Sequence, residues 1–234
     1  MKKEIIAIIP ARGGSEGIPN KNIRLLAGKP LIAHSIVQAQ MISSISRVIV
    51  STDSKKIVKT ALKWKAEVVR RPSEISTSTA SSESALLHVL DYLWNTEGYK
   101  PDIIVFLQCT SPLTSARDIQ ATIDTLIKNE ADVAFTVKPF HYFIWKFKDK
   151  KAVAVNHNKS IRLTRQEKTP QYQETGSVYA IRTEGFIKAR HRFFGKCVMY
   201  IIPPERCLEI DAPFDLWLAE QILQKKQLSV NEKI

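Results

Sequence analysis

Short apolar runs alternate with longer amphipathic segments up to about residue 137 of the chain. The apolar runs are typical of buried strands, whereas in the longer segments apolar residues recur with helical spacing. We predict strands at 5–10, 47–51, 67–69, 102–108 and 132–137, and helices near 30–42, 54–65, 81–95 and 116–129.

This order of elements indicates a fold of the α/β class. Continuous apolar strands separated by helices form parallel sheets covered on both faces, because such strands are buried on both sides. We therefore expect a three-layer α/β/α sandwich with a mostly parallel, doubly wound sheet. Ligands bind beyond the carboxyl ends of the strands in such sheets, so chemistry is expected after Pro10, Ser51, Val69 and Gln108.

The alternation stops at about residue 138. The stretch 139–172 is aromatic, basic and strand-like, with a turn expected near 148–150. We predict that about 138–175 leaves the main sheet as a projecting arm that serves dimerisation. Strands at 178–181 and 198–202 return to the sheet, and a helix at 212–226 ends a single domain that takes in the whole chain, 1–234.

The apolar runs are too short for a membrane span, which needs roughly 18 consecutive apolar residues. The first run is interrupted by Glu4 and ends at Pro10, too early for the core of a signal peptide. The cysteines, Cys109, Cys197 and Cys207, are odd in number and widely spaced, so we predict neither a disulfide framework nor a zinc site. A cytoplasmic protein without a membrane partner is expected.

Charge favours anionic partners. Thirty-five Lys and Arg against 23 Asp and Glu leave a formal net charge of +12. Nucleotides, nucleic acid and acidic sugars all fit this charge, and a basic solvated surface explains it equally well. Charge alone leaves these alternatives open.

The segment after the first strand carries the most specific signal. Glycines 13, 14 and 17 allow backbone N–H groups to approach an anion closely, and Arg12 and Lys21 bracket them with positive charge. The spacing matches neither the P-loop nor the dinucleotide fingerprint. A tight turn without a ligand is the alternative, but the position at the carboxyl edge of a sheet favours a phosphate site.

The run 8–23, IIPARGGSEGIPNKNI, resembles the opening motif of the CMP-N-acylneuraminate synthetases, the acylneuraminate cytidylyltransferase family. The resemblance covers nearly the whole chain, because further motifs follow in order at 51–53, 71–72, 79–82, 107–113, 165–166, 176–179 and 209–211. It implies a nucleotidyltransferase that transfers CMP from CTP to a nine-carbon acidic sugar and releases pyrophosphate.

The resemblance also implies roles for individual residues. Arg12, Lys21 and Asp211 would be catalytic. The nucleotide would be bound by Ala11, Arg12, Gly13, Gly14, Ser15, Lys21, Asn22, Arg71, Ala80 and Ser82. From the residues alone, Ser81 and Ser82 are equally well explained as the N-cap of the following helix.

On the acceptor side, the resemblance implies a sugar pocket lined by Gln108, Arg165, Gln166, Tyr179, Phe193 and Phe194. Arginine suits a sugar carboxylate because its planar fork holds two oxygens. Paired phenylalanines, however, are more often core or interface residues.

The resemblance also implies a magnesium site. Asp211, assisted by Glu209, would bind Mg²⁺, whereas Asp215 fits the first turn of the last helix.

Five positions depart from the family pattern. The family usually has lysine at Glu16, proline at Cys109, arginine at Thr114, asparagine at Thr175 and aspartate at Glu209. Glu16 would place a carboxylate in the phosphate loop, and the changes at Thr175 and Glu209 leave the identity of the sugar open. Sialic, legionaminic and pseudaminic acids all remain candidates.

Two other functions stay open. A ketodeoxyoctonate cytidylyltransferase or a sugar-1-phosphate nucleotidyltransferase would share the architecture, although the loop motif favours the acylneuraminate branch. A non-catalytic nucleotide- or nucleic-acid-binding protein would explain the charge, but no nucleic-acid-binding motif is found and no nucleic-acid partner is expected. The resemblance adds a homodimer in which the arm reaches the sugar pocket of the neighbouring protomer.

Overall fold

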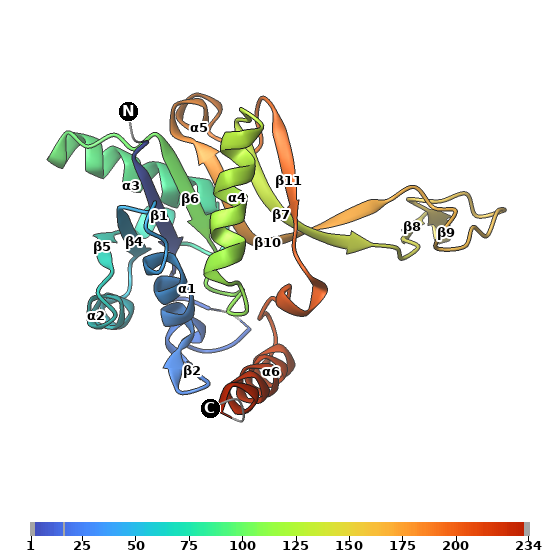
Figure 1. The fold of residues 1–234 in the computed structure, drawn as a ribbon, viewed down its shortest axis with the longest axis horizontal. Helices are drawn as coiled ribbons and strands as arrows, with labels where there is room; N and C mark the ends of the chain where they lie inside the picture. Colours follow the sequence, from blue (N-terminus) through green and yellow to red (C-terminus); the bar gives the residue numbers. More distant parts are fainter. Residues whose placement is uncertain (1–2, 16, 232–234) are drawn as a thin grey trace.

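The centre of the fold is a seven-stranded sheet with the order β11-β7-β10-β6-β1-β4-β5 (Figure 1). The structure, a computed structural model, describes residues 3–15 and 17–231. The strands are β1 (Ile5–Pro10), β2 (Leu25–Leu26), β3 (Lys29–Pro30), β4 (Arg47–Thr52), β5 (Glu67–Arg70), β6 (Ile103–Leu107), β7 (Val133–Phe140), β8 (Trp145–Lys148), β9 (Lys151–Ala154), β10 (Gln171–Arg182) and β11 (Cys197–Ile201). The α-helices are α1 (Leu31–Gln40), α2 (Lys55–Lys63), α3 (Ser82–Glu97), α4 (Ala116–Lys128), α5 (Thr183–Ala189) and α6 (Pro213–Asn231).

The sheet is mostly parallel, as predicted. Strand β1 pairs in parallel with β4 and β6, β4 with β5, and β11 with β7. Strand β10 is the exception, because it runs antiparallel between β6 and β7. The four parallel strands β5, β4, β1 and β6 therefore end at a common carboxyl edge, where the candidate chemistry lies.

Helices cover both faces of the sheet, which confirms the three-layer sandwich. Along β1, Ile5, Ala7 and Ile9 belong to the apolar core that includes α1, α2 and α4. The alternate residues Ile6 and Ile8 belong to the core with α3 and α5. This division follows from the period of two in a strand, which sends successive side chains to opposite faces.

A third, smaller apolar cluster ties the segment after β1 to the C-terminal part of the chain. It contains Ile18, Leu26, Leu31, Ile210 and Ala219. All five side chains are at most 3% exposed. This packing holds the loop with the predicted phosphate site against the 209–211 segment, far away in sequence.

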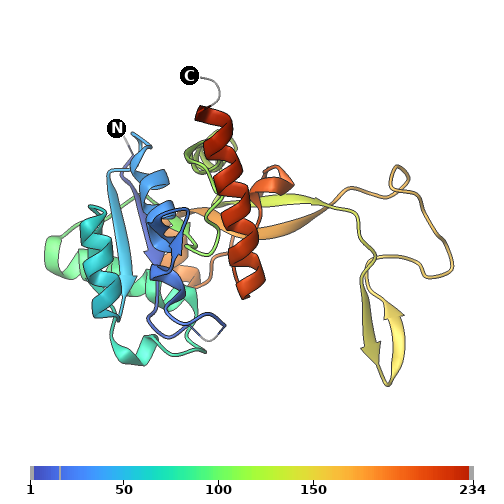
Figure 2. The same cartoon turned by 90° about the horizontal axis from the view of Figure 1, so that it is seen from below.

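The arm projects from the body as a long extension of β7 and β10, which pair as far as Phe140 and Gln171 (Figures 1 and 2). Residues 141–170 lie beyond this pair and include the β8–β9 hairpin. Its turn residues, Asp149 and Lys150, have φ of 49° and 60°, as in the two-residue turns that match the twist of hairpin strands. The chain therefore leaves the main sheet in this region and turns at 149–150, within the range expected from the sequence.

No helix within the described residues is long and apolar enough to cross a membrane.

Candidate functional site

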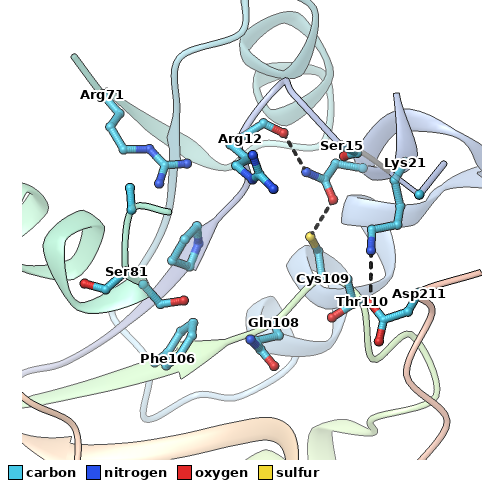
Figure 3. Close-up of a pocket in the computed structure, with 15 residues that line it drawn as sticks. Arg12, Ser15, Lys21, Arg71, Ser81, Phe106, Gln108, Cys109, Thr110 and Asp211 are labelled. Carbon is cyan, nitrogen blue, oxygen red and sulfur yellow. Dashed lines mark hydrogen bonds and ion pairs between the residues drawn. The ribbon is translucent and has the colours of Figure 1, made fainter. Parts of the chain in front are cut away.

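A cavity of about 340 Å³ opens at the carboxyl edge of β1 and β6 (Figure 3). Its wall is made by the loop after β1, the segment before α3, the end of β6 and the 209–211 segment. The lining residues are Pro10, Arg12, Ser15, Gly17, Lys21, Asn22, Arg71, Ala80, Ser81, Ser82, Phe106, Gln108, Cys109, Thr110 and Asp211. The structure therefore brings together most of the residues that the sequence assigned to the nucleotide.

The loop after β1 is anchored by backbone contacts with the neighbouring strand. Ala11 N donates to Ser51 O at 2.9 Å, and Gly13 N donates to Asp53 Oδ1 at 2.9 Å. A Cβ on Gly13 would lie 2.9 Å from Ser54 Cβ, so this close approach needs glycine. Three predicted nucleotide ligands, Ala11, Gly13 and Gly14, lie in this loop but outside the cavity lining.

Lys21 reaches across the cavity to the 209–211 segment. Its Nζ donates to Ile210 O at 2.8 Å and forms an ion pair with Asp211 Oδ1 at 3.3 Å. Gly17 makes this approach possible, because a Cβ there would lie 2.6 Å from Asp211 O. The Lys21 side chain is 15% exposed and that of Asp211 is 73% exposed, so the carboxylate opens toward solvent and the cavity.

Asn22 links the loop to β6. Its Nδ2 donates to Arg12 O at 2.9 Å, and its Oδ1 accepts from Cys109 Sγ at 3.0 Å. Burial raises the pKa of the Cys109 thiol to about 11, which keeps it protonated and able to donate. The departure at Cys109 therefore supplies a donor that proline lacks, and this donor orients the amide that holds Arg12.

The other wall comes from the segment that leads into α3. Arg71 is buried, and its Nη2 donates weakly to Ser51 O at 3.4 Å. Burial lowers the pKa of Arg71. Ser81 caps α3 by accepting from Ser84 N at 3.2 Å, and both Ser81 and Ser82 face the cavity. The capping and the nucleotide-side explanations of these serines are thus compatible.

Gln108 lies at the end of β6 with its amide against the β10 bulge. A Cβ on Gly176, which has φ of +68°, would lie 2.5 Å from Gln108 Oε1 and 3.7 Å from Glu209 Oε1. Glycine is therefore required where β10 passes Gln108. Glu209 also accepts from Thr110 Oγ1 at 3.4 Å.

Two carboxylates of the 209–211 segment have different environments. Burial, and then the charge of Asp211, raise the pKa of Glu209. Asp211 lines the cavity, but Glu209 does not. Asp215 is used elsewhere, because its Oδ2 accepts from Asp211 N at 3.0 Å and Ala212 N at 2.7 Å at the start of α6. It has the helix-terminal role expected from the sequence.

These carboxylates fit a magnesium ion that completes its shell with other ligands. Asp211 and Glu209 supply hard oxygens, and burial and the charge of Asp211 raise the pKa of Glu209, so a cation beside both would relieve their repulsion. No group of three or more His, Cys, Asp or Glu suited to a metal is found among the described residues. Water and substrate phosphates would therefore have to provide most of the coordination.

The predicted sugar-binding residues are divided between body and arm. Tyr179 is 2% exposed and stacks on Phe106, 5.2 Å between ring centroids. Phe193 packs edge-on against Phe135, and Phe194 packs against Gly185. These three aromatic residues lie in or against the core and do not line the cavity.

Arg165 and Gln166 lie in the exposed arm, outside the cavity lining. Figures 1 and 2 show that the arm points away from the body of the same chain. One chain therefore does not bring these two residues to the cavity.

Other departures from the family pattern lie in the interior. Thr175 and Thr136 share a hydroxyl contact at 2.7 Å, and Thr175 Oγ1 also donates to Thr136 O at 3.0 Å. Thr175 is thus engaged with β7 and not with the cavity. Thr114 is buried, and its Oγ1 has no partner within the described part of the chain. Glu16 lies outside the described residues.

Sequence reasoning assigned no role to several residues that shape the site. Asp53 holds Gly13, Phe106 and Thr110 line the cavity, and Cys109 orients Asn22. The position of Asp53 and Thr110 after predicted strands was an available signal, because strand ends converge at this edge. The contact between Cys109 and Asn22 has no local signal.

Comparisons with known proteins find similarity to cytidylyltransferases. A family described as "Cytidylyltransferase" matches residues 6–234. The chain is 34% identical over 223 residues to N-acylneuraminate cytidylyltransferase A of Danio rerio, covering 94% of this chain and 50% of that protein. It is 30% identical over 239 residues to Post-translational flagellin modification protein B of Campylobacter coli, covering 98% and 99%.

A third relative, pseudaminic acid cytidylyltransferase of Campylobacter jejuni, is 28% identical, with 92% of this chain and 94% of that protein covered. The chain thus spans about half the length of the Danio relative and nearly all of the two Campylobacter proteins.

Solved structures share the fold. CMP:2-keto-3-deoxy-manno-octonic acid synthetase complexed with CTP has a TM-score of 0.69 at 16% identity, covering 95% of this chain and 99% of that one. The 4-diphosphocytidyl-2C-methyl-D-erythritol synthase of Anaerococcus prevotii has a TM-score of 0.69 at 14% identity, covering 96% and 100%. At these identities the likeness concerns the fold alone.

Proposed function

The chain belongs to the cytidylyltransferase family, and from this premise we propose that it transfers CMP from CTP to a nine-carbon acidic sugar. The observation that carries the proposal is the cavity in which Arg12 and Lys21 of the glycine-rich loop face Asp211 at the carboxyl edge of the sheet. Two cations and a carboxylate suit a triphosphate and its metal ion.

The acceptor class rests on the named relatives. Their names refer to N-acylneuraminate and to pseudaminic acid, both acidic sugars. An eight-carbon acceptor remains the second candidate, because a synthetase of 2-keto-3-deoxy-manno-octonic acid has the same fold. The N-acylneuraminate and pseudaminic relatives favour the nine-carbon sugar, since their likeness extends to the sequence.

In the proposed reaction the C2 hydroxyl of the sugar attacks the α-phosphate of CTP in line. A bond forms between the sugar oxygen and the α-phosphorus, the bond to the bridging oxygen breaks, and pyrophosphate leaves with the hydroxyl proton released. Lys21 and Arg12 neutralise the charge that develops on the phosphates. Asn22 keeps Arg12 in place through its hydrogen bond to the Arg12 carbonyl.

Asp211 and Glu209 would hold Mg²⁺ when it is bound, and the ion would supply electrostatic stabilisation of the phosphate oxygens. In the structure Asp211 is paired with Lys21 at 3.3 Å. Substrate binding would replace this ion pair by separate contacts of Lys21 with phosphate and of Asp211 with the metal.

We further propose a homodimer in which the arm of one protomer completes the acceptor side of the other. Exposed aromatic side chains on the arm support it, with Trp145 48% and Phe147 84% exposed. The position of Arg165 and Gln166 on this arm gives the dimer a functional reason.

The three free cysteines fit the reducing cytoplasm, which is where we place the reaction.

Pyrophosphate release with CTP and Mg²⁺ tests the function, using a panel of nine-carbon and eight-carbon acidic sugars beside GTP, ATP and UTP. Release with CTP and one nine-carbon sugar is expected. Release with an eight-carbon sugar alone would favour the second candidate, and no release with any pair would contradict the proposal.

A further inference from the structure

A buried ion pair lies beside the cavity wall, between Arg192 and Glu83. Arg192 Nε donates to Glu83 Oε1 at 2.6 Å, and the two side chains are only 17% and 11% exposed. Burial alone raises the pKa of Glu83, but the hydrogen bond and charge of Arg192 outweigh it and lower that pKa. The pair is therefore ionised at neutral pH.

The two partners belong to different sides of the cavity. Glu83 directly follows Ser82 in the first turn of α3, where the nucleotide wall begins. The Arg192 guanidinium lies 5.1 Å from the centroid of the Phe106 ring and 4.9 Å from that of Tyr179. Phe106 lines the cavity, and Tyr179 stacks on Phe106 on the acceptor side.

The hydroxyl of Tyr179 extends the same chain of contacts by donating to Glu174 on β10. Phe193, the residue after Arg192, packs edge-on against Tyr179, 6.2 Å between ring centroids. One side chain, Arg192, thus contacts Phe106 of the cavity wall, the Tyr179 ring stacked on it, and the helix that starts with Ser82. No other arginine in the described residues lies over two aromatic rings.

The chemistry of this cluster fits positioning better than simple stabilisation. Removing two charges from water offsets much of their attraction, so an apolar pair would stabilise the core at least as well. Only arginine offers a flat cation that stacks on rings while it bonds a carboxylate. A network of this kind specifies one arrangement of the groups that it joins.

We infer that Arg192 is a positioning residue, which acts through Glu83 on the nucleotide wall and through Phe106, with Tyr179 stacked on it, on the acceptor wall. This inference rests on the proposed function. It predicts that the ion pair between Arg192 and Glu83 governs the binding of both substrates, although neither residue lines the cavity. The relative position of the two walls then depends on the pair.

The test compares Michaelis constants in Glu83→Gln, Arg192→Lys and Arg192→Met. We expect Arg192→Met to raise KM for both CTP and the acceptor by about tenfold, the size of coupling found within one network, while kcat changes less. Glu83→Gln raises both constants by a smaller factor because the stacking remains. The double variant Glu83→Gln/Arg192→Met should match Arg192→Met, since the interaction is already lost.

Glu184→Gln is the matched control, because its ion pair with Lys188 is exposed and distant from the cavity lining. It should leave both KM values unchanged. If the Glu83 and Arg192 variants lowered the melting temperature but left both KM values unchanged, the inference would be overturned. If Arg192→Met fails to fold, Glu83→Gln and Arg192→Lys carry the test.

Calorimetric titration with CTP keeps this result separate from the proposed function. Wild-type protein that binds CTP but releases no pyrophosphate with any acceptor would contradict the proposed function. Weaker CTP binding by Glu83→Gln than by wild type would still support the inference. Equal CTP affinity in the two proteins would overturn it.

Discussion

The nucleotide side of the cavity and the arm differ in how far one chain completes them. Arg12 and Lys21 come from one loop and Asp211 from a segment 190 positions after Lys21, yet contacts within one chain hold them around one cavity. Arg165 and Gln166 lie on an exposed arm, outside the lining of this cavity. One chain thus completes the proposed phosphate site, whereas the proposed acceptor residues lie away from it.

The side chains around the two regions differ in the same way. Ile18, Leu26 and Ile210, which support the nucleotide side, are at most 3% exposed. On the arm, Tyr142, Trp145 and Phe147 are 63%, 48% and 84% exposed. Contiguous exposed apolar groups mark interaction surfaces, so the exposure of the arm supports the proposed dimer.

The largest effect is expected at the nucleotide side. Lys21→Ala should lower kcat by about 10²–10³-fold, because it removes a cation aimed at the charge of the transition state. The free energy of unfolding should change little, since the ion pair that is lost has an exposed partner. Steady-state kinetics and thermal unfolding measure both effects, with the exposed Lys59→Ala as control. Turnover near that of wild type would refute the role.

On the arm, Arg165→Ala should affect the acceptor and not CTP. We expect kcat/KM for the acid sugar to fall about 10–100-fold, the value of a hydrogen-bonded contact to a charged group. CTP affinity, measured by calorimetry, should stay unchanged. Lys159→Ala, an exposed arm residue, serves as control. A loss of CTP affinity instead would erase the distinction between the two regions.

Phe147→Asp should weaken the dimer. Burying a charge in place of an aromatic anchor raises the dimer dissociation constant by about tenfold or more. Sedimentation over a range of concentrations measures it, and specific activity should become dependent on concentration. Leu62→Asp, at an exposed apolar position on α2, should have no such effect. A Phe147→Asp protein that remains as dimeric as wild type would exclude this residue from the interface.

The smallest effect on activity is expected from the ion pair between Asp118 on α4 and Arg206, which lies just before the 209–211 segment. Arg206 Nε and Nη2 donate to Asp118 at 2.8 and 2.7 Å, and Asp118 is fully buried. Asp118→Asn should lower the free energy of unfolding by about 3 kcal/mol at pH 7, because it leaves the Arg206 charge without its partner.

The same substitution has a predictable pH dependence. Burial raises the pKa of Asp118, but the hydrogen bonds from Arg206 and Ser115 outweigh it and lower that pKa. The stabilisation is therefore complete above the ordinary aspartate pKa of about 3.9 and is lost as pH falls below it. Denaturant unfolding should show wild type and Asp118→Asn converging in acid. A constant difference at all pH values would contradict this account.

Local patterns were sufficient to predict the sandwich, the loop after β1 and the arm. The alternation of apolar residues and the spacing of glycines can be read from neighbouring positions. The sequence was therefore enough to assign Arg12 and Lys21 to the loop after β1. The full length of β10 was not predicted from the sequence, which indicated a strand only at 178–181. Residues 171–177 are polar and contain Gly176, and they form a strand because β7 pairs with them beyond the body.

Contacts between distant residues were beyond sequence reasoning. Cys109 meets Asn22 across 87 positions, and Lys21 meets Asp211 across 190 positions. Such pairs depend on how whole elements pack, and no single sequence records them. Arg192 was missed for the same reason, because its ion pair with Glu83 spans 109 positions.

Mixing two variants of low activity tests most directly whether one chain supplies the nucleotide side and a second copy supplies the acceptor side. Lys21→Ala and Arg165→Ala proteins are denatured together, refolded and assayed for pyrophosphate release. In mixed dimers, one of the two cavities combines an intact Lys21 with an intact Arg165 of the partner. The account predicts that mixing restores about a quarter of wild-type activity. Mixed dimers no more active than the separate variants would contradict it.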